Sequence, residues 1–218
     1  MALNRYSKKE MACRVANELQ EGWVVNVGIG MPLTVLPFVS VERGVIFHSE
    51  NGIIGMGPEL EDPSKGDTDL LSAGKRPVSL IPGGSFVHHA DSFLIARGGK
   101  LDAAILGAYQ VASNGDLANW KLPGAKLGSI GGAMDIAVGA RRVFVVMSHT
   151  ANDGTPKILE TLSYPVTARG CVTKIFTDIA VISVTDDGLV LEEMPQGVTI
   201  ADVQNVTAAP LIASPSLG

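Results

Sequence analysis

Apolar residues recur at every fourth position near the start of the chain. The positions with this spacing are Met11, Val15 and Leu19. Just before them, Ser7 and Glu10 have the spacing of a capping box, in which each side chain accepts a backbone N–H at the start of a helix. The pattern predicts an amphipathic helix over residues 7–20.

The apolar runs further along the chain are too short for helices, and most are bounded by Gly, Pro or Asp. Such runs predict buried strands. They occupy residues 23–27, 45–48, 77–82, 103–106, 143–147 and 179–184. A helix is expected over residues 33–40 and a glycine-dense loop over residues 52–66. The alternation predicts an α/β fold with a largely buried sheet.

The sequence contains no internal repeat, low-complexity tract or linker that would separate two domains. We therefore expect a single domain over residues 1–207. Residues 208–218 are rich in Ala, Pro and Ser, and we expect them to form a C-terminal tail that frays or docks on a partner.

Composition narrows the possible functions. The 218 residues are 46% hydrophobic and carry a net charge of only −5, so a folded core is expected. No basic run exceeds Arg141-Arg142 and only 5% of the residues are aromatic, which argues against nucleic-acid binding.

Targeting features are missing from the pattern as well. No apolar stretch approaches the roughly 18 to 20 residues of a membrane span, and the polar N-terminus lacks the apolar run of a secretory signal. Cys13 and Cys171 cannot form a disulfide framework, which favours reduced thiols. We expect a cytoplasmic protein with no membrane contact.

Two glycines, Gly28 and Gly30, follow the first predicted strand. The third glycine of a dinucleotide-binding fingerprint would stand at position 33, which is Leu33, and Pro32 interrupts the approach. These glycines are better interpreted as a structural turn.

The densest group of possible metal ligands is His88-His89-Ala90-Asp91. Adjacent histidines on an extended segment point to opposite faces, and no second ligand group has a recognisable spacing, so no metal site is expected. The hypothesis is that one histidine is packed or hydrogen-bonded and the other faces a cleft.

Glu50 follows an apolar strand directly and precedes a glycine-rich stretch. Open α/β sheets place reactive groups at such strand ends, where glycines allow a substrate to come close. The alternative is that Glu50 caps a turn or pairs with a base, since Asn-Gly is a common turn sequence.

A second glycine cluster stands at positions 128, 131 and 132, before an apolar run that predicts a helix. Consecutive glycines expose backbone N–H groups that can bind an oxyanion or a phosphate. Close backbone packing is the alternative, and both can hold together.

Five motifs in register resemble the small (B, or β) subunit of the family I CoA-transferases, the 3-oxoacid CoA-transferase group. They are NVGIGMP at 26–32, HSENGIIG at 48–55, LIPGG at 80–84, DLANW at 116–120 and GGAMD at 131–135. The resemblance extends from about residue 5 to residue 207. It implies a single-domain open sheet with flanking helices, the fold shared with ribose-5-phosphate isomerase.

The resemblance also implies the chemistry. Glu50 would be the nucleophile that forms an acyl–glutamyl anhydride and then a glutamyl-CoA thioester, in a ping-pong pattern. Backbone N–H groups at Gly131 and Gly132 would stabilise the oxyanion, a donor being worth roughly 3 to 4 kcal/mol. Coenzyme A would be substrate and covalent intermediate, with no permanently bound cofactor and no metal.

Further site residues are inferred with alternatives left open. Asn51 could orient the Glu50 carboxylate, and Gly28 and Gly30 could shape a loop near the site. Lys75 could balance a substrate carboxylate or a CoA phosphate, or could be a solvated surface lysine.

Similar proteins have their active site between two domains of this fold, and this chain holds one. The resemblance therefore implies that a separate CoA-transferase α (A) subunit is the partner, in an αβ or α2β2 assembly. Succinyl-CoA with acetoacetate or 3-oxoadipate, and acetate or butyrate with acetoacetyl-CoA, compete as substrates. His88 or His89 could assist a dicarboxylate if protonated. A non-catalytic relative that binds an acyl-CoA or a sugar phosphate is the alternative from another class.

Overall fold

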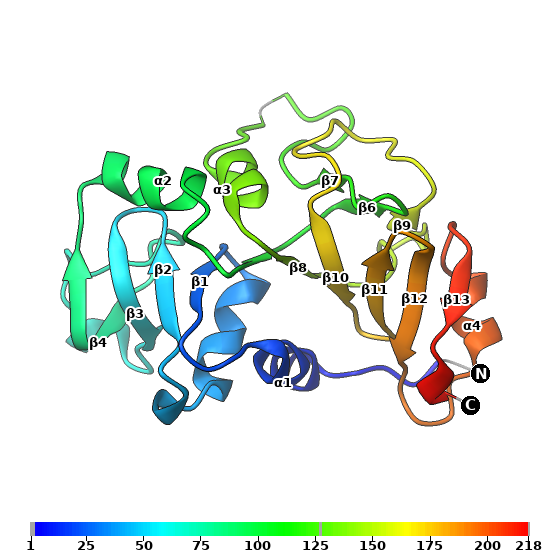
Figure 1. The fold of residues 1–218 in the computed structure, drawn as a ribbon, viewed down its shortest axis with the longest axis horizontal. Coiled ribbons are helices and arrows are strands. Elements are labelled where there is room, and N and C mark those ends of the chain that lie inside the picture. The colour runs from blue at the N-terminus through cyan, green and yellow to red at the C-terminus, as the bar shows by residue number, and fades with distance from the viewer. Residues whose placement is uncertain (1–2, 127, 218) are drawn as a thin grey trace.

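The structure is a computed structural model that describes residues 3–126 and 128–217. It confirms the α/β class with an open sheet and flanking helices (Figure 1). The ten strands of the main sheet lie in the order β13-β12-β11-β10-β8-β5-β1-β2-β3-β4. In chain order these are β1 (Val24–Val27), β2 (Ile46–Ser49), β3 (Ile53–Glu59), β4 (Val78–Phe86), β5 (Ala103–Leu106), β8 (Val143–Val146), β10 (Val172–Phe176), β11 (Val181–Thr185), β12 (Gly188–Glu193) and β13 (Leu211–Ala213).

The remaining elements cover the sheet or extend from it. The α-helices are α1 (Lys8–Glu18), α2 (His89–Arg97), α3 (Ala133–Gly139) and α4 (Ile200–Asn205), and the longest 3-10 helix is η1 (Met31–Phe38). A small three-stranded sheet consists of β6 (Gln110–Ala112), β7 (Leu117–Ala118) and β9 (Ile158–Leu159). None of the helices in the described ranges has the length and apolar character that crossing a membrane would require.

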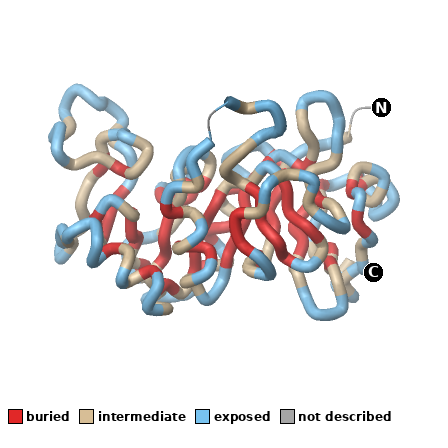
Figure 2. Tube along the Cα trace, turned by 90° about the horizontal axis from the view of Figure 1, so that it is seen from above, coloured by how far each residue is buried: buried red, intermediate tan, exposed pale blue. Residues whose placement is uncertain are grey.

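The five central strands, β10, β8, β5, β1 and β2, run parallel. All four positions of β5 and of β8 are buried, as expected for a sheet covered on both faces. Figure 2 shows this buried centre surrounded by exposed loops. Antiparallel strands extend the sheet on both sides.

Residues alternate between two apolar cores, one on each face of the sheet. In β8, Phe144 belongs to the core that contains Val15 and Leu19 of α1, whereas Val145 belongs to the core that contains Ile136 of α3. Burying each large apolar side chain contributes about 1.5–3 kcal/mol. Figure 1 accordingly shows α1 on one side of the sheet and α2 and α3 together on the other.

The predicted first helix is confirmed as α1. The Ser7 N–H donates to Glu10 Oε2 at 2.8 Å, and the Glu10 N–H donates to Ser7 Oγ at 3.2 Å, which completes the capping box. The strand predictions are confirmed as β1, β2, β4, β5, β8 and β11.

Two local predictions are wrong, and a third is right in position but not in the type of helix. The loop expected over 52–66 contains β3, because its glycines serve close packing: a Cβ on Gly55 would lie 2.9 Å from Gly84 Cα of β4. The helix expected over 33–40 is the 3-10 helix η1, which contains two prolines that cannot donate α-helical hydrogen bonds. His89 is the first residue of α2 and His88 is its N-cap, so the two do not lie together on an extended segment.

The last residues of the chain contribute to the main sheet. Leu211–Ala213 forms β13, which pairs in parallel with β12, Leu211 opposite Leu189. The strand is therefore joined to the main sheet by backbone hydrogen bonds, although it lies within residues 208–218, which the composition predicts to be a C-terminal tail.

Candidate active site

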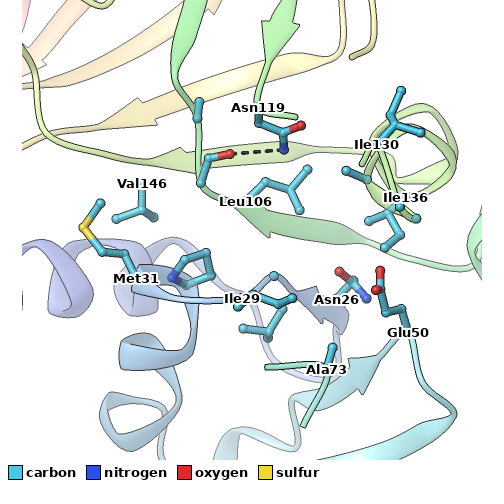
Figure 3. A pocket seen from close by; sticks show the side chains of 18 of the residues that line it. Asn26, Ile29, Met31, Glu50, Ala73, Leu106, Asn119, Ile130, Ile136 and Val146 are labelled. Carbon is cyan, nitrogen blue, oxygen red and sulfur yellow. Dashed lines mark hydrogen bonds between the residues drawn. The ribbon is translucent and has the colours of Figure 1, made fainter. Parts of the chain in front are cut away.

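A cavity of about 600 Å³ opens at the carboxyl ends of the central parallel strands (Figure 3). Its lining includes four segments at these strand ends, namely the stretch after β1, the residue after β2, the stretch after β5 and the glycine-rich loop before α3, together with Ala73, Asn119 and Val146. Because parallel strands end at the same edge of a sheet, segments far apart in sequence meet there. The lining residues used below are Asn26, Gly28, Glu50, Ala73, Tyr109, Asn119, Gly131 and Gly132.

Glu50 is the residue immediately after β2, in the tight turn to β3. The Gly52 N–H donates to the Ser49 carbonyl at 2.9 Å, which closes the turn. Gly52 has φ +105°, and a Cβ there would lie 2.3 Å from the Val87 carbonyl oxygen, so only glycine fits. This turn holds the Glu50 carboxyl at the cavity.

The surroundings of Glu50 favour a reactive carboxylate. Burial raises the pKa of Glu50 above its usual value, and the charge of His89 opposes that rise in part. Within the described residues, the carboxylate accepts no hydrogen bond. A carboxylate that is partly desolvated and unpaired keeps its lone pairs free for attack on an electrophile.

Gly132 packs directly against Glu50. A Cβ at this position would lie 2.6 Å from Glu50 Oε2 and 2.4 Å from Phe93 Cζ. Gly131, by contrast, has φ +51° and open space where a Cβ would be. In the part of the chain that the structure describes, the N–H groups of both glycines have no acceptor. The arrangement leaves two donors available beside a carboxylate.

Buried polar side chains line the inner side of the site. Asn26 of β1 is 1% exposed and His48 of β2 is fully buried; Asn26 Nδ2 lies 2.9 Å from His48 Nδ1. On its other side, His48 Nε2 lies 2.8 Å from Ser92 Oγ of α2. Figure 3 draws the Asn26 amide beside the Glu50 carboxyl.

The segment that follows Leu71 is tied to the same turn. Asn51 Nδ2 donates to the Leu71 carbonyl at 2.7 Å, and the Ala73 N–H donates to Ser49 Oγ at 3.2 Å. The structure therefore directs Asn51 to the backbone of this segment and brings Ala73 to the cavity. Lys75, at the tip, is exposed, does not line the cavity, and has φ +59°.

The other sequence candidates separate into two groups. Gly28 lines the cavity, where its N–H donates to the Ile105 carbonyl at 2.9 Å and a Cβ would lie 3.0 Å from that oxygen. Gly30 precedes η1 with φ +85° and does not line the cavity.

The two adjacent histidines have different surroundings. His88 caps α2, its Nδ1 accepting from the Ala90 N–H at 3.2 Å. His89 is exposed and contacts the Phe93 ring edge-on, with ring centroids 5.0 Å apart. Its charge acts on Glu50, so the structure brings His89 close to the predicted nucleophile. Over the described ranges, no three His, Cys, Asp or Glu side chains gather as a metal site would require.

Sequence reasoning assigned no role to Asn26, His48, Ser92 or Asn119. Two of them carried a signal: Asn26 and His48 are polar residues within otherwise apolar strands, and a buried polar group needs a partner. The Asn119 amide donates to the Gly107 carbonyl at 3.2 Å, the dashed line in Figure 3, and holds the cavity's far side.

Comparisons with known proteins identify the family. The family model described as Coenzyme A transferase matches residues 8–205. The chain is 47% identical to the β (B) subunit of the 3-oxoadipate CoA-transferase of Pseudomonas putida over 210 residues, covering 95% of this chain and 97% of that protein. It is 42% identical to the β (B) subunit of the succinyl-CoA:3-ketoacid coenzyme A transferase of Helicobacter pylori, covering 90% and 94%.

Solved structures share the fold. The chain superposes on an acyl-CoA transferase from Escherichia coli O157:H7 with a TM-score of 0.75 at 23% identity, covering 99% of this chain and 43% of that longer chain. It superposes on glutaconate coenzyme A-transferase from Acidaminococcus fermentans with a TM-score of 0.71 at 16% identity, covering 99% and 91%.

Proposed function

This chain belongs to the family I coenzyme A transferases, as a β subunit, and from that premise we propose that Glu50 is the nucleophile in transfer of CoA from succinyl-CoA to a 3-oxo acid. The observation that carries the proposal is the Glu50 carboxyl itself. It is partly buried at the carboxyl edge of the sheet and accepts no hydrogen bond within the described residues. It lines a cavity of about 600 Å³ together with Gly131 and Gly132, whose N–H groups have no acceptor among those residues.

The first half-reaction begins with attack of a Glu50 carboxylate oxygen on the thioester carbonyl of the acyl-CoA. The carbon–sulfur bond breaks, CoA leaves as a thiolate, and the acyl group remains as an anhydride with Glu50. The thiolate then attacks the glutamyl carbonyl and expels the first acid as its carboxylate, which leaves a glutamyl-CoA thioester. The acceptor acid reverses both steps, so no ATP or metal is consumed.

The glycine-rich loop would stabilise these steps. Each addition to a carbonyl creates an oxyanion, and a donor aimed at that oxygen is worth roughly 3 to 4 kcal/mol. We assign this role to the N–H groups of Gly131 and Gly132, which are free within the described residues. Gly28 contributes only backbone to the cavity lining, and a Cβ there would lie 3.0 Å from the Ile105 carbonyl oxygen.

A partner chain would complete the site. The relatives from Pseudomonas putida and Helicobacter pylori are named as B subunits, which supports a separate α subunit for this chain in an αβ or α2β2 assembly. The proposed catalytic domain spans residues 1–207, and β13 adds the last strand to its sheet from beyond that range. Coenzyme A would be substrate and covalent intermediate, with no cofactor permanently bound.

The proposed acceptor is 3-oxoadipate or acetoacetate. The name of the Pseudomonas putida relative contains 3-oxoadipate, and that of the Helicobacter pylori relative contains 3-ketoacid, the class to which acetoacetate belongs. The test uses this chain co-purified with its α subunit. With succinyl-CoA and labelled succinate but no acceptor, a ping-pong enzyme exchanges label into succinyl-CoA. Addition of each acid then identifies the acceptor, with acetate as the comparison.

Exchange that depends on Glu50 supports the proposal. A complex that binds succinyl-CoA but exchanges no label contradicts it and favours a non-catalytic acyl-CoA-binding relative. Transfer to acetate in preference to both 3-oxo acids would instead identify an acetate–acetoacetate type of enzyme.

A further inference from the structure

We propose that the buried pair His48 and Ser92 is a positioning device that turns the NH₂ group of the Asn26 amide into the cavity, where it donates to the reacting oxygens beside Glu50. This inference rests on the proposed function for its catalytic consequence. Its structural part, the direction of the hydrogen bonds in the chain Ser92–His48–Asn26, stands independently.

An unpartnered buried oxygen points to this role. The Asn26 side chain is 1% exposed, and among the described residues its Oδ1 finds no donor. A buried polar atom without a partner costs about 1–3 kcal/mol. Asn26 and Glu50 both line the cavity, and Figure 3 draws the Asn26 amide beside the Glu50 carboxyl, which can accept a hydrogen bond but cannot donate one to this oxygen when ionised.

An amide has two orientations that fill the same space. In the first, Asn26 Nδ2 donates to His48 Nδ1 and Oδ1 is left facing the cavity. In the second, Oδ1 accepts a proton from His48 Nδ1 at 2.9 Å, and the NH₂ group faces the cavity. The second orientation removes the orphaned acceptor and gives up only a 3.4 Å contact between Asn26 Nδ2 and the His48 carbonyl.

The contacts of Ser92 independently favour the second orientation, in which His48 Nδ1 donates to Asn26 Oδ1. If His48 donated through Nε2, the Ser92 hydroxyl would have to donate elsewhere, and the other acceptor within its reach is the Ser49 carbonyl at 3.5 Å. That oxygen already accepts the Gly52 N–H at 2.9 Å. If instead the Ser92 hydroxyl donates to His48 Nε2 at 2.8 Å, the bond has normal length. The imidazole proton then belongs on Nδ1.

The His48 imidazole can fix the direction of these hydrogen bonds because it stays neutral. Burial lowers the pKa of His48 to about 4, so near neutral pH the ring carries one proton and cannot donate from both nitrogens. The proton on Nδ1 therefore decides which end of the Asn26 amide faces the cavity.

His149 provides an internal control, since it is the other buried histidine and burial lowers its pKa to about 4 as well. Its Nε2 lies 2.8 Å from Thr207 Oγ1, and that hydroxyl donates to the Val203 carbonyl at 2.7 Å. On the other side, His149 Nδ1 lies 2.9 Å from Thr177 Oγ1, whose contact with the Ala180 carbonyl is longer, at 3.1 Å. The shorter Thr207–Val203 bond favours Thr207 as the hydroxyl that accepts from His149 Nε2, with Thr177 donating to Nδ1. The two buried rings are expected to be opposite tautomers, Nδ1–H at His48 and Nε2–H at His149.

The test is nitrogen NMR of the full chain labelled with ¹⁵N-histidine. The chain has only 4 His, and Ser92→Ala should shift the signals of His48 but not those of His149, which assigns them. Protonated Nδ1 at His48 supports the proposal. Protonated Nε2 as the major form overturns it, and neither result depends on whether the chain is a transferase.

Matched variants test the catalytic part in the complex with the α subunit. An Asn side chain places its amide near the former Nδ1, and a Gln side chain near the former Nε2. His48→Asn can still donate to Asn26 and should lose less activity than His48→Gln, which should lower kcat about 10- to 100-fold with little change in KM. Equal losses in both variants, or a loss confined to KM, overturn the positioning role.

Discussion

The two walls of the cavity differ in how firmly they are bonded. The strand wall consists of Asn26 and Glu50 at the ends of β1 and β2, with His48 bonded to Asn26 outside the lining; Asn26 and His48 are at most 1% exposed. The glycine wall is the loop over residues 128–132. There Gly131 has open space where a Cβ would be, and within the described residues its N–H has no acceptor.

The difference indicates that the two walls have different roles in the site. The strand wall positions the nucleophile by a tight backbone turn, next to side chains that are already joined by buried hydrogen bonds, so little reorganisation remains when the substrate arrives. The glycine wall leaves donors and space unfilled, which a thioester carbonyl can occupy. We therefore predict that substitutions in the strand wall either remove the nucleophile or move it out of position. In the glycine wall, we predict that only substitutions that leave the Glu50 carboxyl in place preserve activity.

The largest effect is expected from Glu50→Gln, which keeps the shape of the strand wall and removes the nucleophile. Transfer should fall on the order of 10⁴-fold or more, as for other covalent catalysts that lose their nucleophile. Steady-state rates and co-purification with the α subunit measure the two consequences. Transfer comparable to that of the unmodified chain would contradict the assignment.

Gly132→Ala disrupts the contact between the two walls. The new Cβ would lie 2.6 Å from Glu50 Oε2, so the carboxylate must move. A misplacement on the order of 1 Å can cost about 100-fold, and we expect a loss of that size in kcat. A variant with kcat within about threefold of the original would show that Glu50 does not need this space.

Gly131→Ala is the matched control on the glycine wall. The position has room for a Cβ but φ +51°, so the substitution strains the backbone by roughly 1–2 kcal/mol without displacing Glu50. We expect a lower unfolding midpoint and a loss in kcat below about tenfold. A loss equal to that of Gly132→Ala would mean that backbone strain, not the space beside Glu50, explains both.

The pH dependence sharpens the electrostatic part of the comparison. Burial raises the pKa of Glu50 and the charge of His89 opposes this, so kcat/KM for the acyl-CoA should fall on the acidic side as Glu50 gains a proton. His89→Gln removes a charge that favours the carboxylate. The acidic limb should therefore move to higher pH in the variant, and an unchanged limb or a move to lower pH would count against the contact.

The smallest effect is expected on stability. Because the pKa of Glu50 is raised in the folded chain, the folded state binds more protons, and stability falls as pH rises through that raised pKa. Gln cannot ionise, so Glu50→Gln should unfold at a slightly higher denaturant concentration than the unmodified chain near neutral pH, with a smaller difference under acid conditions. A less stable variant near neutral pH would contradict burial of the charge.

The sequence predicts those parts of the site that depend on local pattern. The Ser7–Glu10 capping box and the short apolar runs are local signals, and they locate α1 and the central strands correctly. Glu50 stands out for the same reason, since an acidic residue directly after an apolar strand falls at the carboxyl edge of the sheet.

The rest depends on contacts between distant residues. Asn26 and His48 meet because β1 and β2 pair in parallel with these residues opposite one another, which neither strand reveals alone. Asn51 lies next to Glu50 in sequence, yet its amide binds the Leu71 carbonyl, because side chains of adjacent residues in a turn diverge. The glycines that suggested a loop over 52–66 permit β3 to pack closely on β4.

The central claim is that the Glu50 carboxyl becomes covalently joined to CoA. Intact-protein mass spectrometry of the chain with its α subunit, after incubation with succinyl-CoA, tests it directly when followed by peptide mapping. We predict a gain in mass of CoA minus water on the peptide that contains Glu50, absent in Glu50→Gln. An assembled complex that transfers CoA without this adduct, or carries it on another residue, would contradict the proposed mechanism.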